Sequence, residues 1–292
     1  MRFFVTVLLL FTTVSTVFAK PSAVASVFPL YNIASVIAQG EVNLRLLVAA
    51  GVDPHTFQPR PADVAEISSA DLFFYISEDF EPWAGRFAGR AGRAVSFANP
   101  GALHICDGEH KHNHGGDGFR DPHIWTDPEE IPRIIEIIRD NLARLLPERA
   151  QFFEENARAL TERFIDLDLR YKEQFSKISR REVFFAGHNS FSAFAQRYDL
   201  RFIPVTQSFS SSAEPSPRQV AQIIVKIRES GVEYIFYDAL KSRALAETIA
   251  HETGVEILPL FSVHTVSPQD FERRISFFEF MQKNYENLFR GL

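Results

Sequence analysis

Residues 148–179 carry the sequence ERAQFFEENARALTERFIDLDLRYKEQFSKIS, a helical pattern of about thirty residues with neither glycine nor proline. If it is fully helical, this segment extends on the order of 45 Å. That is too long for a packing helix of one small domain, and its polar content argues against a membrane role. We therefore predict one rigid helix that joins two lobes, with two shorter helices and a bend as the alternative.

On both sides of this helix, short apolar runs alternate with helical patterns. The predicted strands are residues 23–28, 43–48 and 71–76 before it, and 182–186, 201–205, 233–237 and 255–258 after it. Nearly continuous apolar residues are typical of parallel strands covered on both faces. The predicted fold class is α/β, with two lobes at residues 20–147 and 180–292 that contain parallel-type sheets, joined by a linking helix at 148–179.

Three helix starts are marked by proline at the first helical position. Asp127 and Ser216 precede Pro128 and Pro217 as N-caps, and Pro61 begins the third helix. These residue types favour helix N-termini because they satisfy or remove the free N–H groups there.

The first nineteen residues predict a cleaved signal peptide. Arg2 is followed by an apolar stretch, and the small residues at Val17 and Ala19 place cleavage after Ala19. A transmembrane anchor is the alternative, but the run is somewhat short of the ~20 residues needed to span a bilayer. Cys106 is the only cysteine, so no internal disulfide forms, and it lies far from the cleavage point, so no lipid anchor is indicated. We expect a soluble exported protein of the periplasm.

Composition narrows the class of partner. Of 292 residues, 46% are hydrophobic and 13% aromatic, which is enough for a substantial core and excludes a disordered or fibrous chain. The formal net charge of −6 argues against nucleic acid or an anionic membrane as partner.

Five metal-binding side chains fall in one glycine-rich stretch at residues 103–118, LHICDGEHKHNHGGDG. They are His104, Cys106, His110, His112 and His114. This composition predicts a weak accessory metal-collecting loop at 104–118 without fixed geometry, and a solvated polar loop is the alternative.

Three other histidines occupy loops near predicted strand ends or helix starts. His55 lies between the strand at 43–48 and the helix at Pro61, His188 directly follows the strand at 182–186, and His123 precedes the helix at Pro128. In open α/β sheets ligands bind outside the carboxyl ends of strands, in such loops. We therefore predict that these three imidazoles bind a metal ion together.

Two of these histidines share the tripeptide Asp-Pro-His, at 53–55 and 121–123. The proline stiffens each loop, and Asp53 and Asp121 are predicted to accept the second ring N–H and so fix the tautomer. Three neutral imidazoles suit zinc and leave one coordination position open. His264, Asp238 or water are the candidates for that fourth position.

Four motifs in succession resemble the ZnuA-type solute-binding proteins, the metal receptors of bacterial zinc and manganese ABC importers. They are GVDPHTFQPRP at 51–61, DPHIWTDP at 121–128, Gly187-His188 and EPSP at 214–217, and they run in order over nearly all the chain after residue 19. The resemblance implies two α/β lobes with the metal in the cleft between them, and it places His55, His123 and His188 at the family's three ligand positions.

The resemblance also bears on the choice of metal. Zinc members resemble this chain in carrying histidine at the third position and a His-rich loop before the second, whereas manganese members typically carry glutamate at the third. Many relatives have an acidic fourth ligand near the end of the chain, but the stretch LFSVHT at 260–265 has no acid. His264 or water would take that place.

The predicted function is a periplasmic solute-binding protein that captures zinc for a high-affinity ABC importer. A manganese or ferrous-iron receptor of the same family is the alternative within this class. A secreted zinc hydrolase with three histidines and a bound water is the alternative from another class, although the compact H-E-x-x-H arrangement is missing from the sequence. A surface adhesin that uses the metal for stability is disfavoured because no anchor signal is present.

The predicted partners are the metal ion and the membrane permease, on which both lobes dock. We expect a monomer without enzymatic activity. The long linking helix should limit hinge motion, so that release of the ion depends on local loop movement.

Overall fold

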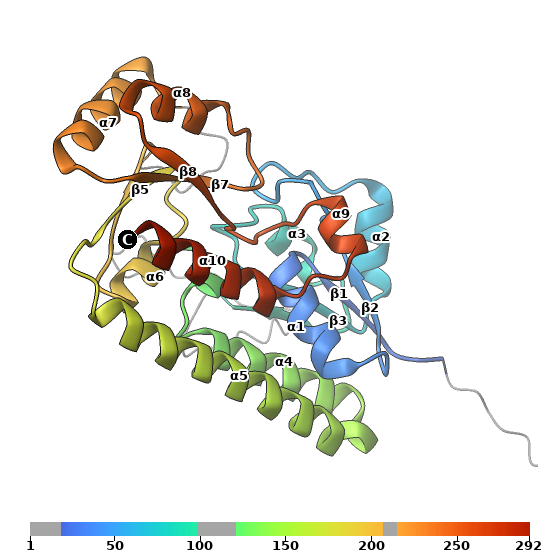
Figure 1. Cartoon of the computed structure of the whole chain (residues 1–292). Helices are drawn as coiled ribbons and strands as arrows, with labels where there is room; N and C mark the ends of the chain where they lie inside the picture. The colour runs from blue at the N-terminus through green and yellow to red at the C-terminus, as the bar shows by residue number, and fades with distance from the viewer. Residues whose placement is uncertain (1–18, 98–120, 207–214) are drawn as a thin grey trace, which may run out of the picture.

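The computed structural model of the chain describes residues 19–97, 121–206 and 215–292 (Figure 1). The predicted signal peptide, apart from Ala19, and the predicted histidine-rich loop at 104–118 lie outside these ranges. Within the described residues, no helix combines the length and the apolar character needed to cross a membrane.

Two four-stranded sheets, both entirely parallel, form the framework. The first has the order β2-β1-β3-β4, with β1 Ser22–Ala25, β2 Asn43–Leu46, β3 Leu72–Tyr75 and β4 Ala94–Ser96. The second has the order β6-β5-β7-β8, with β5 Glu182–Ala186, β6 Arg201–Pro204, β7 Tyr234–Asp238 and β8 Glu256–Leu260. Both sheets have the same connectivity, in which the first strand of the sheet lies between the second and the third. The strand order changes direction at this point, and open α/β sheets bind ligands there, at the carboxyl ends of the strands.

Helices cover both faces of each sheet. Their bounds are α1 Phe28–Ala38, α2 Pro61–Ser69, α3 Ala84–Ala88, α4 Ile131–Leu145, α5 Ala150–Ser176, α6 Ser192–Arg197, α7 Pro217–Ser230, α8 Ala244–Thr253, α9 Pro268–Glu272 and α10 Phe277–Gly291. Short 3₁₀ helices lie at Ile124–Thr126 and Pro147–Arg149.

Alternate strand residues enter different apolar clusters. Phe73 packs with α2 and α3 on the outer face of the first sheet, whereas its neighbour Phe74 enters the central core. In the second sheet Phe184 packs with α7 and α8, and Phe185 enters the same central core. Successive strand residues point to opposite faces, so one strand serves two layers.

The long helix α5 runs along one side of the molecule, beside α4, and also packs against α1 and α10 (Figure 1). Its buried residues recur every three or four positions: Phe153, Ala157, Leu160, Phe164, Leu167, Asp168, Tyr171 and Phe175. This spacing is the one that keeps a single stripe of an α-helix facing the core. The predicted α/β class, with two parallel sheets joined by one long helix, is confirmed, and the helix is continuous.

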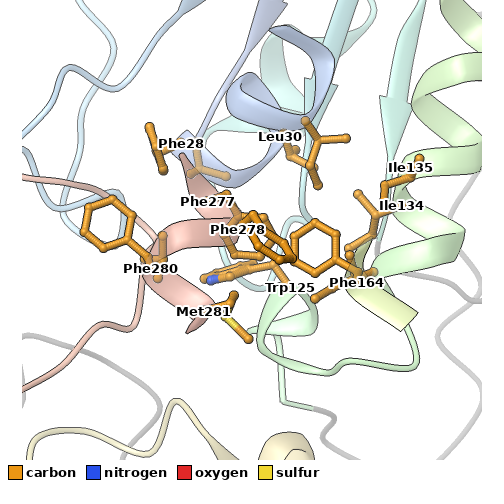
Figure 2. Packing of buried hydrophobic residues seen from close by; sticks show 14 of the residues in the cluster. Phe28, Leu30, Trp125, Ile134, Ile135, Phe164, Phe277, Phe278, Phe280 and Met281 are labelled. Carbon is orange, nitrogen blue, oxygen red and sulfur yellow. The ribbon is translucent and has the colours of Figure 1, made fainter. Parts of the chain in front are cut away.

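A central core connects the two halves. Figure 2 shows the indole ring of Trp125 amid side chains from α1, α4, α5 and α10. After β8 the chain crosses to the first sheet, where Phe271 of α9 packs against Phe28 and Tyr31, and α10 then returns toward β8. Consequently the last part of the chain packs against both sheets.

Several element boundaries differ from those predicted. Phe28 begins α1 rather than ending a strand, because Pro29 suits the first turn of a helix. Residues 127–130 form a turn, and α4 begins at Ile131, after the predicted start at Pro128. The helix starts at Pro61 and Pro217 are confirmed, and Ser216 caps the latter by accepting from the Gln219 backbone N–H. The short strand β4 was not predicted, since three residues give too little periodicity to detect.

Candidate metal centre

Three histidines converge between the two sheets. One ring nitrogen from each of His55, His123 and His188 lies within 4.8 Å of the others. The Nε2 atoms of His123 and His188 are 3.3 Å apart, and the ring centroids of His55 are 5.5 and 5.6 Å from those two rings. The structure thus brings the three predicted residues together, while their role as metal ligands stays a prediction.

The three rings come from different parts of the fold. His55 lies in the loop between β2 and α2, His188 lies just after β5, and His123 directly precedes the 3₁₀ helix at Ile124–Thr126. His55 and His188 therefore belong to loops at the carboxyl edges of the two sheets, and His123 to the segment that connects the sheets. A metal bound by all three would therefore link the loops of both sheets and the segment that connects the sheets.

Asp121 determines which nitrogen of His123 is available. Its Oδ1 lies 2.7 Å from His123 Nδ1 and also accepts from the His123 backbone N–H at 2.9 Å, and its Oδ2 accepts from the Ser192 hydroxyl. Burial opposes the charge on Asp121, but the hydrogen bonds from His123 and Ser192 outweigh it and lower the pKa of the carboxyl. Because an ionised carboxylate can only accept, Nδ1 carries the proton and Nε2 presents its lone pair to the site.

The second Asp-Pro-His tripeptide has the same backbone turn and a different second contact. Asp53 Oδ1 accepts from the His55 backbone N–H at 3.0 Å, which matches the bond between Asp121 and His123. When an aspartate side chain accepts the backbone N–H of the residue two positions later, the three residues form an Asx turn. Both Asp-Pro-His tripeptides form this turn, which positions the two histidines through the backbone. The other oxygen of Asp53 pairs with Lys241 Nζ at 2.7 Å, across to the turn after β7.

Asp238 lies on the far side of the His188 ring. Its Oδ2 is 3.9 Å from His188 Nδ1, whereas His188 Nε2 faces His123. The carboxyl is fully buried, which raises its pKa, and it accepts from the Leu240 backbone N–H and the Ser262 hydroxyl. Asp238 is therefore placed to orient the His188 ring through Nδ1, while Nε2 of His188 faces His123.

His264 stands beside the three histidines. Its ring centroid is 5.6 Å from that of His55 and 5.8 Å from that of His188, and its side chain is buried. The Ser262 hydroxyl donates to Asp238 and lies 3.0 Å from His264 Nδ1. Since the single hydroxyl proton is used on Asp238, Nδ1 of His264 is the donor to Ser262, and Nε2 keeps a free lone pair. In the described residues, the group within 4.8 Å comprises the other three histidines without His264.

Three of the four imidazoles, those of His55, His188 and His264, have lowered pKa values. Burial, followed by the electrostatic interaction with His123, lowers the pKa of His55 to about 4. Burial is also the largest cause that lowers the pKa of His188 and of His264 well below the ordinary value. At neutral pH a metal ion at these three rings would meet lone pairs and would not need to displace protons.

One buried nitrogen of the centre, His55 Nε2, has no hydrogen-bond partner among the described residues. A buried polar atom left in this state costs free energy unless a ligand completes it. Imidazole nitrogens are a ligand type that suits zinc.

Two aromatic rings, those of Phe80 and Trp125, pack against the histidines, and no local sequence pattern predicted this contact. The Phe80 ring lies 4.5 Å from the His55 ring and 5.6 Å from that of His123, and Trp125 lies 5.3 Å from His123. The indole Nε1 of Trp125 donates to the Ser262 carbonyl at 2.8 Å. Trp125 was visible inside the second motif, but Phe80 is one of 29 phenylalanines and nothing in its neighbourhood distinguishes it.

The accessory residues His104, Cys106, His110, His112 and His114 lie outside the described part of the chain. Their predicted role as a weak metal loop stays a prediction.

The chain matches a known family and solved structures. The model of the family described as "Zinc-uptake complex component A periplasmic", ZnuA, matches residues 23–291. The zinc-binding lipoprotein AdcA of Streptococcus pneumoniae is 29% identical over 278 residues, which cover 92% of this chain and 55% of AdcA. The high-affinity zinc uptake system protein ZnuA of Bacillus subtilis is 26% identical over 279 residues, covering 92% and 86% of the two chains. The chain thus spans about half the length of AdcA and most of the Bacillus subtilis protein.

Two solved structures illustrate the likeness in fold. The Zn(II)-bound ZnuA-like domain of Streptococcus pneumoniae AdcA has a TM-score of 0.77 at 27% identity, covering 94% of this chain and 99% of the domain. The laminin-binding protein Lmb of Streptococcus agalactiae, described as bifunctional with adhesin and metal transporting activity, has a TM-score of 0.78 at 26% identity, covering 93% and 99%.

Proposed function

This chain belongs to the ZnuA family of periplasmic zinc-uptake components, and from that premise we propose that it captures a zinc ion and delivers it to the permease of an ABC importer. The observation that carries the proposal is the convergence of His55, His123 and His188, with one nitrogen of each within 4.8 Å of the others. The ion is the cargo, which the protein binds and releases without a chemical step.

The nature of the ligand atoms favours zinc over manganese. All three converging ligand atoms are imidazole nitrogens, and burial keeps the pKa of His55 and His188 below the ordinary histidine value. Imidazole suits zinc, whereas manganese prefers carboxylate, carbonyl and water oxygens. The names of the AdcA and Bacillus subtilis relatives, which are zinc proteins, support the same choice.

For the fourth coordination position we propose His264. Its ring stands beside those of His55 and His188, and the chain of hydrogen bonds from Asp238 through Ser262 leaves Nε2 without a proton. Asp238 is the weaker candidate because its carboxyl faces Nδ1 of His188, on the opposite side of that ring from His123. Water is the remaining alternative.

The family description, which names a periplasmic component, supports the proposed place of action. We propose that the protein works as a monomer outside the cytoplasmic membrane, in the periplasm, after removal of residues 1–19. The permease then receives the ion from a surface formed by both lobes, with the sheets at residues 20–147 and 180–292 on either side of the linking segment 148–179.

A competition titration tests the proposed function. Metal-stripped protein should bind one equivalent of zinc tightly, and excess manganese should not displace it. His188→Ala removes one converging nitrogen and should weaken zinc binding by more than about 100-fold, since even partners of metal ligands contribute 10- to 100-fold. His251→Ala is the matched control, because the His251 side chain is 88% exposed on α8 and should leave the affinity unchanged.

Each failure of this titration has its own meaning. Displacement of zinc by equal concentrations of manganese would show that the site does not select zinc over manganese. Normal zinc binding by His188→Ala would show that His188 is not a zinc ligand and that the proposed set of three histidines is incorrect.

A further inference from the structure

A positive charge stands beside a site that is arranged for a cation. Lys241 lies in the turn after β7, and its Nζ is 2.7 Å from Asp53 Oδ2. That turn is anchored on the site itself, because Asp238 accepts the Leu240 N–H through its side chain and the Lys241 N–H through its backbone carbonyl. The backbone of the turn that carries Lys241 is therefore fixed by Asp238, whose carboxylate lies beside Nδ1 of His188.

Its partner Asp53 is equally fixed to the site. The Asp53 carboxylate accepts the His55 backbone N–H with Oδ1 and the Lys241 ammonium with Oδ2. The pair is 188 residues apart in sequence and joins the His55 loop of the first half to the β7 turn of the second. One negative and one positive charge thus lie at fixed positions next to the same histidines.

The lysine charge reaches the histidines that would surround the ion. Asp53 links Lys241 Nζ at 2.7 Å to the His55 backbone N–H at 3.0 Å. Burial is the largest cause that lowers the pKa of His55, His188 and His264, and Lys241 adds a smaller effect in the same direction, whereas Asp53 opposes it on His55 and His264. A field that disfavours a proton on an imidazole disfavours a divalent cation at the same nitrogens about twice as strongly.

We propose that Lys241 and Asp53 are an affinity-setting pair, in which the lysine weakens metal binding and speeds release while the aspartate strengthens binding. The inference rests on the proposed function. A receptor that hands its ion to a permease needs tight capture together with escape, and a fixed positive charge beside the ligands limits the residence time of the ion without removing any ligand. Neither residue touches the ion in this role; both act through the field at the imidazoles.

The competing explanation is a mechanical one, in which the ion pair only ties the two halves together. The two explanations predict different signs. If the pair acts as a tie, removing either partner breaks the same contact and weakens zinc binding in both variants. If the pair acts through charge, the two single variants shift the affinity in opposite directions.

The experiment measures zinc affinity and zinc release rate for four metal-stripped variants. Lys241→Met keeps the aliphatic stem and should tighten zinc binding roughly tenfold and slow release, and Asp53→Asn should weaken binding by a similar factor while its amide oxygen still accepts the His55 N–H. The double variant should return close to the wild-type affinity. Lys226→Met on the exposed face of α7 is the control for loss of one positive charge.

The outcomes separate this inference from the proposed function. Failure of the wild-type protein to bind zinc would contradict the function itself. Normal wild-type binding with a weaker or unchanged affinity in Lys241→Met would overturn the affinity-setting role. If Lys241→Met does not fold, the double variant decides: an affinity close to that of the wild-type protein supports the role, and an affinity as weak as that of Asp53→Asn overturns it.

Discussion

At the scale of single residues, the proposed fourth ligand can be tested apart from the other three. His264→Ala removes an imidazole whose Nε2 keeps its lone pair, but it leaves His55, His123 and His188 in place. Zinc should still bind as one equivalent, with an affinity about 10- to 100-fold weaker, because water takes the open position. A competition titration at neutral pH measures this difference.

Ser262→Ala provides the companion to that experiment. It removes the hydroxyl that orients His264 but keeps the ring, so the loss should be smaller than that of His264→Ala. An affinity in His264→Ala equal to that of the wild-type protein would assign the fourth position to water or Asp238 instead.

How far the sequence predicts the site depends on the residue. His55 and His123 were recognisable because proline and aspartate flank them in a repeated tripeptide, and His188 because it follows an apolar strand. The contact between Asp53 and Lys241 could not be predicted, since it joins loops 188 residues apart. Phe80 shows the same limit: its place against His55 results from packing between distant segments, which no local pattern encodes.

At the scale of elements, a polar cluster fixes α5 to its neighbours. Asp168 of α5 accepts from Arg197 of α6 and from the Tyr198 hydroxyl, which in turn contacts the Tyr285 hydroxyl of α10. Burial opposes the charge on Asp168, but hydrogen bonds from Arg197 and Tyr198 outweigh it and lower the pKa of the carboxyl. The stabilisation from this lowered pKa is present above the unfolded-state value of ~3.9 and is lost as the pH falls through the folded-state value.

Arg197→Met should therefore lower the free energy of unfolding by about 2 kcal/mol at pH 7, as expected for a charge-assisted hydrogen bond inside a partly buried cluster. The difference from wild type should shrink as the pH is lowered below ~4, where Asp168 becomes protonated in the unfolded chain. Urea unfolding between pH 7 and pH 3 measures both effects. Arg201→Met is the control: its side chain is 73% exposed in the pair with Glu182, so it should change stability by less than ~0.5 kcal/mol.

The elements differ in how well the sequence indicated them. The α5 helix was predicted because neither glycine nor proline interrupts its helical pattern, although two shorter helices with a bend stayed open as the alternative until the structure showed one helix of 27 residues. The start of α4 was placed too early because the motif of Asp127 and Pro128 also suits a turn, which is what it forms. Local residue types indicate that a helix begins nearby, and the packing of Ile131 and Ile134 into the core decides where.

At the scale of the whole molecule, the two sheets share one continuous core. It contains residues of the first sheet such as Phe74, of the second such as Phe185, and of α5 and α10 between them, including Phe164 and Phe277. A hinge that opened the molecule would have to expose part of this core or bend α5, and both cost free energy in proportion to the apolar area exposed. The fold therefore predicts that the ion enters and leaves through local movement of loops.

Small-angle scattering with and without zinc tests this rigidity. A protein of this length has a radius of gyration of about 19 Å, and zinc binding should change it by less than ~0.5 Å. Hydrogen exchange should at the same time slow in the loops that carry His55 and His123, and remain the same along α5, because only the loops become ordered by the ion. A decrease of about 2 Å or more on zinc binding, with altered exchange in α5, would show that the halves close on each other and that the shared core does not prevent domain motion.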